Sequence, residues 1–260
     1  MTVTIFASGS GGNCMLIRSA AANILIDAGI SARKLSASLG RCGLSLQDIG
    51  GVLITHEHSD HIYGLKPLVV RFGVPAYASK EAAVRIGCAV PELYGMINSI
   101  PVGERFSLCG LGITAFPTPH DAPGSVGYRI DDGSVFAVAT DMGCVTDAVR
   151  DGLRGADAVL IEANHDEDML RYGPYPPMLK RRILSNEGHL SNACCAELAR
   201  ELASGGTGKI ILGHLSRQNN SPEAALSAVA RAIDGLGAAL YCAPEYGCLE
   251  LDAGGGPCSR

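Results

Sequence analysis

Three histidines and one aspartate stand within six positions in the run His56-Glu57-His58-Ser59-Asp60-His61. The run follows the apolar segment 52–55, which predicts a buried strand, so the turn begins at a fixed point of a sheet. His56 and His58 can converge on one cation, and Asp60 and His61 can face a second cation beside it. Imidazole and carboxylate ligands suit Zn, Mn or Fe, and the absence of cysteine from the run argues against a structural zinc site.

Three further candidate ligands stand at the ends of other predicted strands. His120 follows the apolar segment 112–116, Asp141 ends the segment 135–140, and His214 follows the segment 209–212. We therefore predict two divalent ions (Zn²⁺, Mn²⁺ or Fe²⁺) with these ligands: His56, His58 and His120 for the first, Asp60, His61 and His214 for the second, and Asp141 between them. In such sites the ions lie ~3.5–4 Å apart and share a hydroxide, which is the nucleophile. No serine or cysteine nucleophile is then required.

The remainder of the chain alternates apolar runs with glycine turns. The predicted strands cover residues 2–7, 14–18, 23–26, 52–55, 105–109, 112–116, 126–130, 135–140, 158–162 and 209–212, and the end of the chain returns to β structure. The predicted helices cover residues 31–42, 65–72, 145–153, 191–203 and 222–233. Strands followed by helices in each half fit two packed sheets with helices outside, so the expected fold class is α/β, a four-layer αββα sandwich. We expect one domain over residues 1–252 and a flexible tail over residues 253–260.

Composition bounds the class of protein. The net charge of −5 argues against a protein that binds nucleic acid with its whole surface, although bound metal ions would add positive charge locally. The 10 cysteines are scattered and form no CxxC pair. The N-terminus lacks the basic and apolar regions of a signal peptide, and no apolar run approaches the ~20 residues of a membrane helix. We expect reduced thiols, a cytoplasmic location and no membrane partner.

The order His-x-His-x-Asp-His, then a histidine, an aspartate and a final histidine, resembles the signature of the metallo-β-lactamase superfamily. The resemblance extends over nearly the whole chain, and it implies the αββα fold and a metal-dependent hydrolase. Asp27, at the end of the apolar run 24–26, matches the superfamily's first motif. The resemblance implies that this aspartate orients the histidine turn and does not bind metal.

Further segments are similar to the YycJ/WalJ branch of that superfamily, which is associated with 5′-to-3′ DNA exonuclease activity. They are residues 8–13, 162–166, 173–176, 179–183, 188–192 and 214–216. Pro177 departs from the pattern where an aromatic residue is expected, which puts a stacking role of that loop in doubt. The chain also resembles the tRNA-processing ribonuclease Z enzymes. By that analogy His189 donates a proton to the leaving oxygen or binds phosphate. His165 and Asp60 are further catalytic candidates.

Candidate substrate-binding residues lie in three segments. Ser10 and Asn13 belong to a glycine-rich loop that could present N–H groups to a phosphate, although glycines also serve simple hairpin turns. Lys180, Arg181 and Arg182 could contact a nucleic-acid backbone, although short basic runs are common on solvated helix faces. Ser216 follows the last candidate ligand.

The function that these features favour is a two-metal phosphodiester hydrolase, a 5′-to-3′ exonuclease with DNA as its partner. Only 73 residues separate Asp141 from His214, too few for the inserted domain of the β-CASP nucleases. The runner-up is a small-molecule phosphodiesterase that opens cyclic phosphates, and a third possibility is a thioester or lactam hydrolase. A metalloprotein that only scaffolds partners would be expected to lack a ligand, whereas all seven candidates are present. Fold alone does not decide among these activities.

Overall fold

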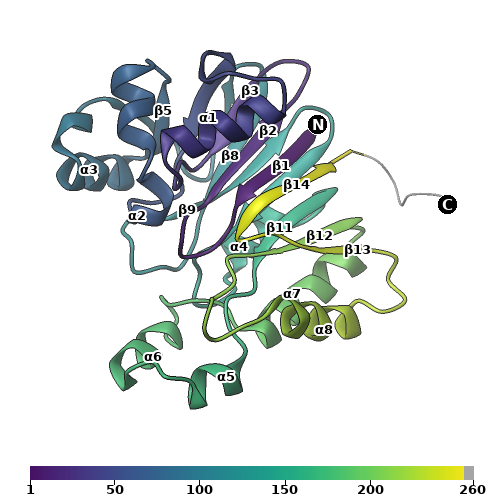
Figure 1. Ribbon diagram of the computed structural model, residues 1–260. Coiled ribbons are helices and arrows are strands. Elements are labelled where there is room, and N and C mark those ends of the chain that lie inside the picture. Colours follow the sequence, from purple (N-terminus) through teal and green to yellow (C-terminus); the bar gives the residue numbers. More distant parts are fainter. Residues whose placement is uncertain (255–260) are drawn as a thin grey trace.

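The computed structural model describes residues 1–254, whose strands form two seven-stranded sheets (Figure 1). The first sheet has the order β14-β1-β2-β3-β4-β5-β6. Its strands are β1 (Thr2–Ala7), β2 (Cys14–Arg18), β3 (Asn23–Ile26), β4 (Ile49–Leu53), β5 (Ala76–Ser79), β6 (Ile97–Ile100) and β14 (Tyr246–Asp252). Strands β3 to β6 are parallel, and Ile26 at the end of β3 pairs with Leu53 at the end of β4.

The second sheet has the order β13-β12-β11-β10-β9-β8-β7. Its strands are β7 (Arg105–Leu108), β8 (Leu111–Pro117), β9 (Val126–Asp131), β10 (Val135–Ala139), β11 (Ala158–Glu162), β12 (Lys209–Gly213) and β13 (Ala239–Cys242). Strands β10 to β13 are parallel, and Ala139, Ile161 and Leu212 lie side by side in register. The residues that follow these three therefore leave the sheet at the same edge.

Helices cover the outer face of each sheet (Figure 1). The first sheet is covered by α1 (Ala32–Arg41) and α3 (Lys80–Ala89), and the second by α4 (Asp147–Leu153), α7 (Asn192–Ser204) and α8 (Pro222–Ala232). The shorter helices are α2 (Ser59–Ile62), α5 (Glu167–Tyr172) and α6 (Pro177–Ile183), with single turns at Leu46–Asp48, Pro67–Arg71 and Pro91–Leu93. Ser191 caps the N-terminus of α7, because its Oγ accepts from the N–H of Cys194 at 3.3 Å.

The core is mainly aliphatic on both faces of both sheets, with Tyr128 and Phe136 as its largest fully buried side chains. In β3, Ile24 and Ile26 pack between the two sheets, whereas Leu25 packs against the helices of the first sheet. Because successive side chains of a strand point to opposite faces, strands buried on both sides consist of continuous apolar runs rather than alternating ones. These four layers confirm the predicted α/β class and αββα sandwich.

The expected helix at 65–72 is present over residues 65–71, of which Pro67–Arg71 is π-helical, and it ends before Gly73, which has a positive φ of 68°. Other stretches differ from the prediction. No element was predicted at β5, α3 or β6. Residues 167–183, for which no helix was predicted, form α5 and α6, whose apolar periodicity is weak because each has only one buried residue. Of the predicted tail, Ala253 is buried and bonded to the Met1 carbonyl, and residues 255–260 lie outside the described residues.

Candidate active site

The predicted ligands come together at one edge of the sandwich, outside the carboxyl ends of parallel strands, which is where α/β sheets bind ligands. The histidine turn leaves β4, and Asp141 and His214 leave β10 and β12. Asp27, Asp141 and His214 each follow a strand with a positive φ, of 59°, 57° and 56°. A positive φ is uncommon for residues other than glycine, and such backbone conformations concentrate at functional sites.

The first predicted set of ligands is assembled as expected. One ring nitrogen from each of His56, His58 and His120 lies within 4.8 Å of the other two. Nε2 of His120 is 3.3 Å from Nδ1 of His58. His56 and His120 are buried, and His58 is half-buried at the opening of the site.

The second set, Asp60, His61 and His214, meets the same distance limit. Nε2 of His61 and Nε2 of His214 each lie 3.6 Å from Oδ2 of Asp60. Asp141 stands between the two sets, because its Oδ2 is 3.3 Å from Nε2 of His61 and its Oδ1 is 3.9 Å from Nε2 of His120. The structure thus brings all seven predicted ligands into two neighbouring groups joined by one carboxylate.

Unpaired buried atoms show that these groups fit metal ions. Nε2 of His56, Oδ2 of Asp141 and Nε2 of His214 are buried and have no hydrogen-bond partner among the described residues. A buried polar atom without a partner costs about 1–3 kcal/mol. A divalent cation bound by these nitrogen and oxygen atoms would remove that cost.

The pKa values of buried groups in the site also favour bound cations. Burial lowers the pKa of His214, but the carboxylates of Asp141, Asp60 and Glu162 outweigh burial and raise it to about 10. Burial is likewise outweighed at Asp141, whose pKa the surrounding histidines hold well below its usual range. The site is therefore a place where positive charge is stabilised, and divalent metal ions supply such charge without protons.

Carboxylates behind the ligands fix their ring orientation. Asp27 accepts from Nδ1 of His61 at 2.7 Å and from the N–H of Thr55 at 2.9 Å. This contact leaves Nε2 of His61 facing Asp60 and Asp141, which matches the orienting role that the resemblance implies. Such a carboxylate–histidine pair sets the tautomer of a metal ligand and raises its basicity.

Glu162 is a functional candidate that the sequence analysis missed. Its side chain is fully buried at the end of β11, and its Oε1 accepts from Nδ1 of His189 at 2.7 Å and from Nδ1 of His214 at 3.0 Å. Oε2 accepts from the N–H of Met142 at 2.8 Å. Burial raises the pKa of Glu162, but the charge of His189 outweighs burial and lowers it to about 2. The detectable signal was an acidic residue closing an otherwise apolar buried strand.

His189 forms a further group able to hold a metal with Asp141, Glu162 and His214, whereas His165 lies apart from all such groups among the described residues. The ring of His189 is 5.3 Å from the rings of both His120 and His214. His165 is only 1% exposed, belongs to none of the groups able to hold a metal among the described residues, and neither of its ring nitrogens has a hydrogen-bond partner there.

The glycine-rich loop supports the histidine turn from behind. Asn13 donates its N–H to the Asp60 carbonyl at 2.7 Å, and its side-chain Nδ2 lies 3.0 Å from Nε2 of His61. Gly9 and Gly12 also donate their N–H groups within the protein. The backbone at position 29 also packs closely against the histidine turn. Only glycine fits there, since a Cβ on Gly29 would lie 1.6 Å from the Asp60 carbonyl oxygen. Ser10 is exposed and lines a cavity of about 330 Å³ with Asp60.

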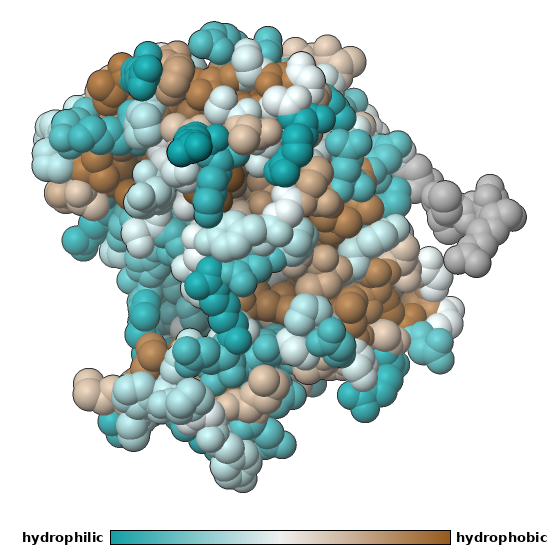
Figure 2. Space-filling view, in the orientation of Figure 1, coloured by the Kyte–Doolittle hydropathy of each residue, from teal (hydrophilic) through white to brown (hydrophobic). Residues whose placement is uncertain are grey.

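The three basic residues of α6 have different surroundings. Lys180 donates to the Arg171 carbonyl at 2.7 Å, which ties α6 to α5. Arg182 reaches the opening of the site, where its Nε donates to Oδ2 of Asp121 at 2.5 Å. Arg181 is exposed. Figure 2 shows α5 and α6 at the lower left as an arm that stands apart from the upper part of the molecule.

Ser216 accepts from the N–H of Asn219 at 3.2 Å in the turn after His214.

Comparison with known proteins gives a consistent result. The model of the family described as "Beta-lactamase superfamily domain" matches residues 22–215. Exodeoxyribonuclease WalJ of Streptococcus pneumoniae is 37% identical over 228 residues, which cover 85% of this chain and 84% of that protein. Exodeoxyribonuclease YycJ of Bacillus anthracis is 34% identical over 240 residues, which cover 90% and 89%. The metallo-β-lactamase fold protein YhfI from Bacillus subtilis shares the fold, with a TM-score of 0.72, 18% identity and coverage of 96% and 98%.

Proposed function

The chain belongs to the β-lactamase superfamily, and on that premise we propose that it is a metal-dependent hydrolase that degrades DNA from the 5′ end. The observation that carries the proposal is a pair of ligand groups joined by Asp141, with His189 held beside them by Glu162. The two exodeoxyribonuclease relatives support DNA as the substrate. We also propose a cytoplasmic location, which the nine free cysteines among the described residues support. No helix in residues 1–254 has the length and apolar character to cross a membrane.

The chemistry divides between the ions and the chain's own side chains. Two divalent ions, Zn²⁺, Mn²⁺ or Fe²⁺, would activate water and neutralise charge that develops on the phosphate. Asp141 and Asp60 set the spacing and charge of the two groups, and Asp27 keeps His61 turned towards them. Glu162 accepts a hydrogen bond from Nδ1 of His189, so Nε2 of that ring can exchange a proton with the substrate. His189 is therefore placed to protonate the leaving oxygen.

The first prediction concerns His189. His189→Ala is expected to slow DNA hydrolysis by about 10²–10⁴-fold, the usual contribution of a general acid. Metal content should stay at the wild-type value, because His120 and His214 keep their other contacts. Bis-p-nitrophenyl phosphate has a leaving group that needs little protonation, so its hydrolysis should fall much less. Equal losses on both substrates in steady-state assays would indicate phosphate binding instead, and wild-type DNA cleavage would leave His189 a structural role only.

The second prediction concerns Arg181, whose exposed side chain can reach a phosphate backbone. Each phosphate contact contributes about 0.7–0.9 to the slope of log affinity against log salt. Arg181→Ala should lower that slope by about one contact, as measured by DNA titrations at several salt concentrations. The matched control is Arg85→Ala, which removes an exposed arginine from α3 on the other sheet. A slope that is the same for Arg181→Ala as for wild type would exclude this contact.

The substrate class is tested by incubating the protein in Mn²⁺ and in Zn²⁺ with end-labelled DNA, end-labelled RNA and bis-p-nitrophenyl phosphate. DNA labelled at its 3′ end should shorten progressively, and DNA labelled at its 5′ end should release a short labelled product at once. The lactam nitrocefin should stay intact. Turnover of cyclic phosphodiesters without DNA cleavage would favour the small-molecule phosphodiesterase, and faster lactam or thioester turnover would favour the third class. Parallel reactions with Asp141→Asn exclude a contaminating nuclease.

A further inference from the structure

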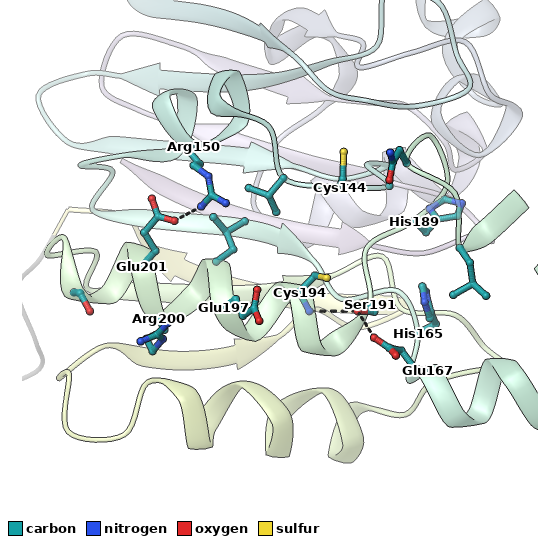
Figure 3. Close-up of a pocket in the computed structure, with 16 residues that line it drawn as sticks. Cys144, Arg150, His165, Glu167, His189, Ser191, Cys194, Glu197, Arg200 and Glu201 are labelled. Atoms are coloured by element: carbon teal, nitrogen blue, oxygen red, sulfur yellow. Dashed lines mark hydrogen bonds and ion pairs between the residues drawn. The ribbon is translucent and has the colours of Figure 1, made fainter. Parts of the chain in front are cut away.

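A cavity of about 720 Å³ opens beside the metal-ligand groups, between α7 and the loop that connects β10 with α4 (Figure 3). Gly143 and Cys144 line it from the loop, and Cys194 and Arg200 line it from α7. His189 is the residue that this lining shares with the groups able to hold a metal. The cavity is therefore next to the reacting atoms without containing the predicted ligands.

We propose that this cavity binds the terminal nucleotide of the strand, with its 3′ oxygen at His189 and its 5′ phosphate towards Arg200. The proposal rests on the nuclease function above and names the part of the substrate that the site recognises. In the step that it implies, the oxygen of water bonds to phosphorus and the bond from phosphorus to the 3′ oxygen breaks. The 3′ oxygen takes a proton from His189 and leaves with the terminal nucleotide, and the shortened strand keeps the phosphate as its new 5′ end.

The size of the cavity fits one small ligand. Pockets that hold small molecules usually measure about 300–1,000 Å³. A cavity of 720 Å³ is within that range, and it is far too small for a base-paired duplex. The strand must therefore enter as a single-stranded end.

His165 gives a second, independent sign of a missing ligand. It lines the cavity, it is 1% exposed, and both of its ring nitrogens lack a hydrogen-bond partner among the described residues. A neutral imidazole offers one donor and one acceptor, and leaving either unpaired in the interior is costly. A nucleotide carries donors and acceptors on its base and sugar that can satisfy this ring.

Of the two arginines that line the cavity, Arg200 is the one that can contact a phosphate, although Glu197 lies one turn before it. Arg150 is ion-paired with Glu201, and Glu167 accepts from the Ser191 hydroxyl at 3.2 Å (Figure 3). Arg200 is exposed and forms no ion pair with the described residues. Arg200 follows Ser191 by nine residues, about 13 Å along a helix, which is longer than one nucleotide. Because helical side chains lean towards the N-terminus, the long side chain of Arg200 has to span the rest of that distance to reach the phosphate.

The test is binding of 2′-deoxyadenosine 5′-monophosphate to the full-length, metal-loaded protein, measured by titration calorimetry. Cys194→Phe fills the cavity from α7 and is expected to weaken binding at least tenfold. Arg200→Gln is expected to weaken it about tenfold, with smaller loss for deoxyadenosine, which lacks the phosphate. The matched control is Ala193→Phe, which adds the same bulk at the neighbouring exposed position of α7, outside the lining, and should bind as wild type does.

Hydrolysis completes the test. Cys194→Phe should keep wild-type hydrolysis of bis-p-nitrophenyl phosphate, which needs no nucleoside pocket, and lose most release of mononucleotides from DNA. Unchanged nucleotide binding in both Cys194→Phe and Arg200→Gln, or displacement of the nucleotide by an equal concentration of inorganic phosphate, would overturn the proposal, because both results place the ligand at the metal ions. If the variants weaken binding as expected but the wild type does not shorten DNA, the nucleotide pocket stands and the proposed nuclease function fails.

Discussion

Replacement of Asp141 by asparagine is expected to remove metal ions and DNA hydrolysis together. The carboxylate joins the two ligand groups, with one oxygen 3.3 Å from His61 and the other 3.9 Å from His120. Asparagine has nearly the same shape but no charge, so both groups lose their shared anion. Because metal ions contribute several kcal/mol to such reactions and each ~1.4 kcal/mol is tenfold in rate, DNA hydrolysis should fall by at least about 10³-fold.

Elemental analysis of the purified variant checks the metal part of this prediction. Wild type should carry two ions per chain after supplementation, and Asp141→Asn at most one. Asp121→Asn is the matched control, because Asp121 also lies near the histidines, 3.4 Å from Nε2 of His120, but is paired with Arg182 at the opening of the site. It should retain two ions. Two tightly bound ions in Asp141→Asn would refute a bridging role for Asp141.

The second large effect is expected from Glu162→Gln. One oxygen of Glu162 accepts from both His189 and His214, so the variant disturbs a predicted general acid and a predicted metal ligand at once. Loss of an orienting carboxylate typically weakens metal affinity 10–100-fold, and loss of the acid costs about 10²–10⁴-fold in rate. DNA hydrolysis should therefore fall at least about 10²-fold even at saturating metal.

A double-mutant comparison isolates the two routes. At saturating metal, adding Glu162→Gln to His189→Ala should cost little further activity if Glu162 acts mainly through His189. Circular dichroism should show a folded protein, and metal titration should report the separate effect on His214. Wild-type metal affinity and wild-type DNA hydrolysis in Glu162→Gln would together exclude the role assigned to this carboxylate.

The sequence alone predicted the layers of the fold and the candidate ligand set. Continuous apolar runs mark strands buried on both faces, and each predicted ligand stands within a few residues of the end of such a run. Both signals are local, since a strand and the turn after it occupy neighbouring positions of the chain. The family resemblance added the orienting role of Asp27, which the contact with His61 supports.

Tertiary structure decided which side chains meet across the chain. Glu162 joins His189 and His214, which are 27 and 52 residues away, and no periodicity of the sequence encodes such a contact. Asn13 was predicted to bind substrate, and only the structure shows that its side chain also lies 3.0 Å from Nε2 of His61. His165 was predicted to share in catalysis, yet it lines a neighbouring cavity that forms only when α7 packs beside the loop after β10. Strand pairing in register sets these distances, because it fixes where each chain segment leaves the sheet.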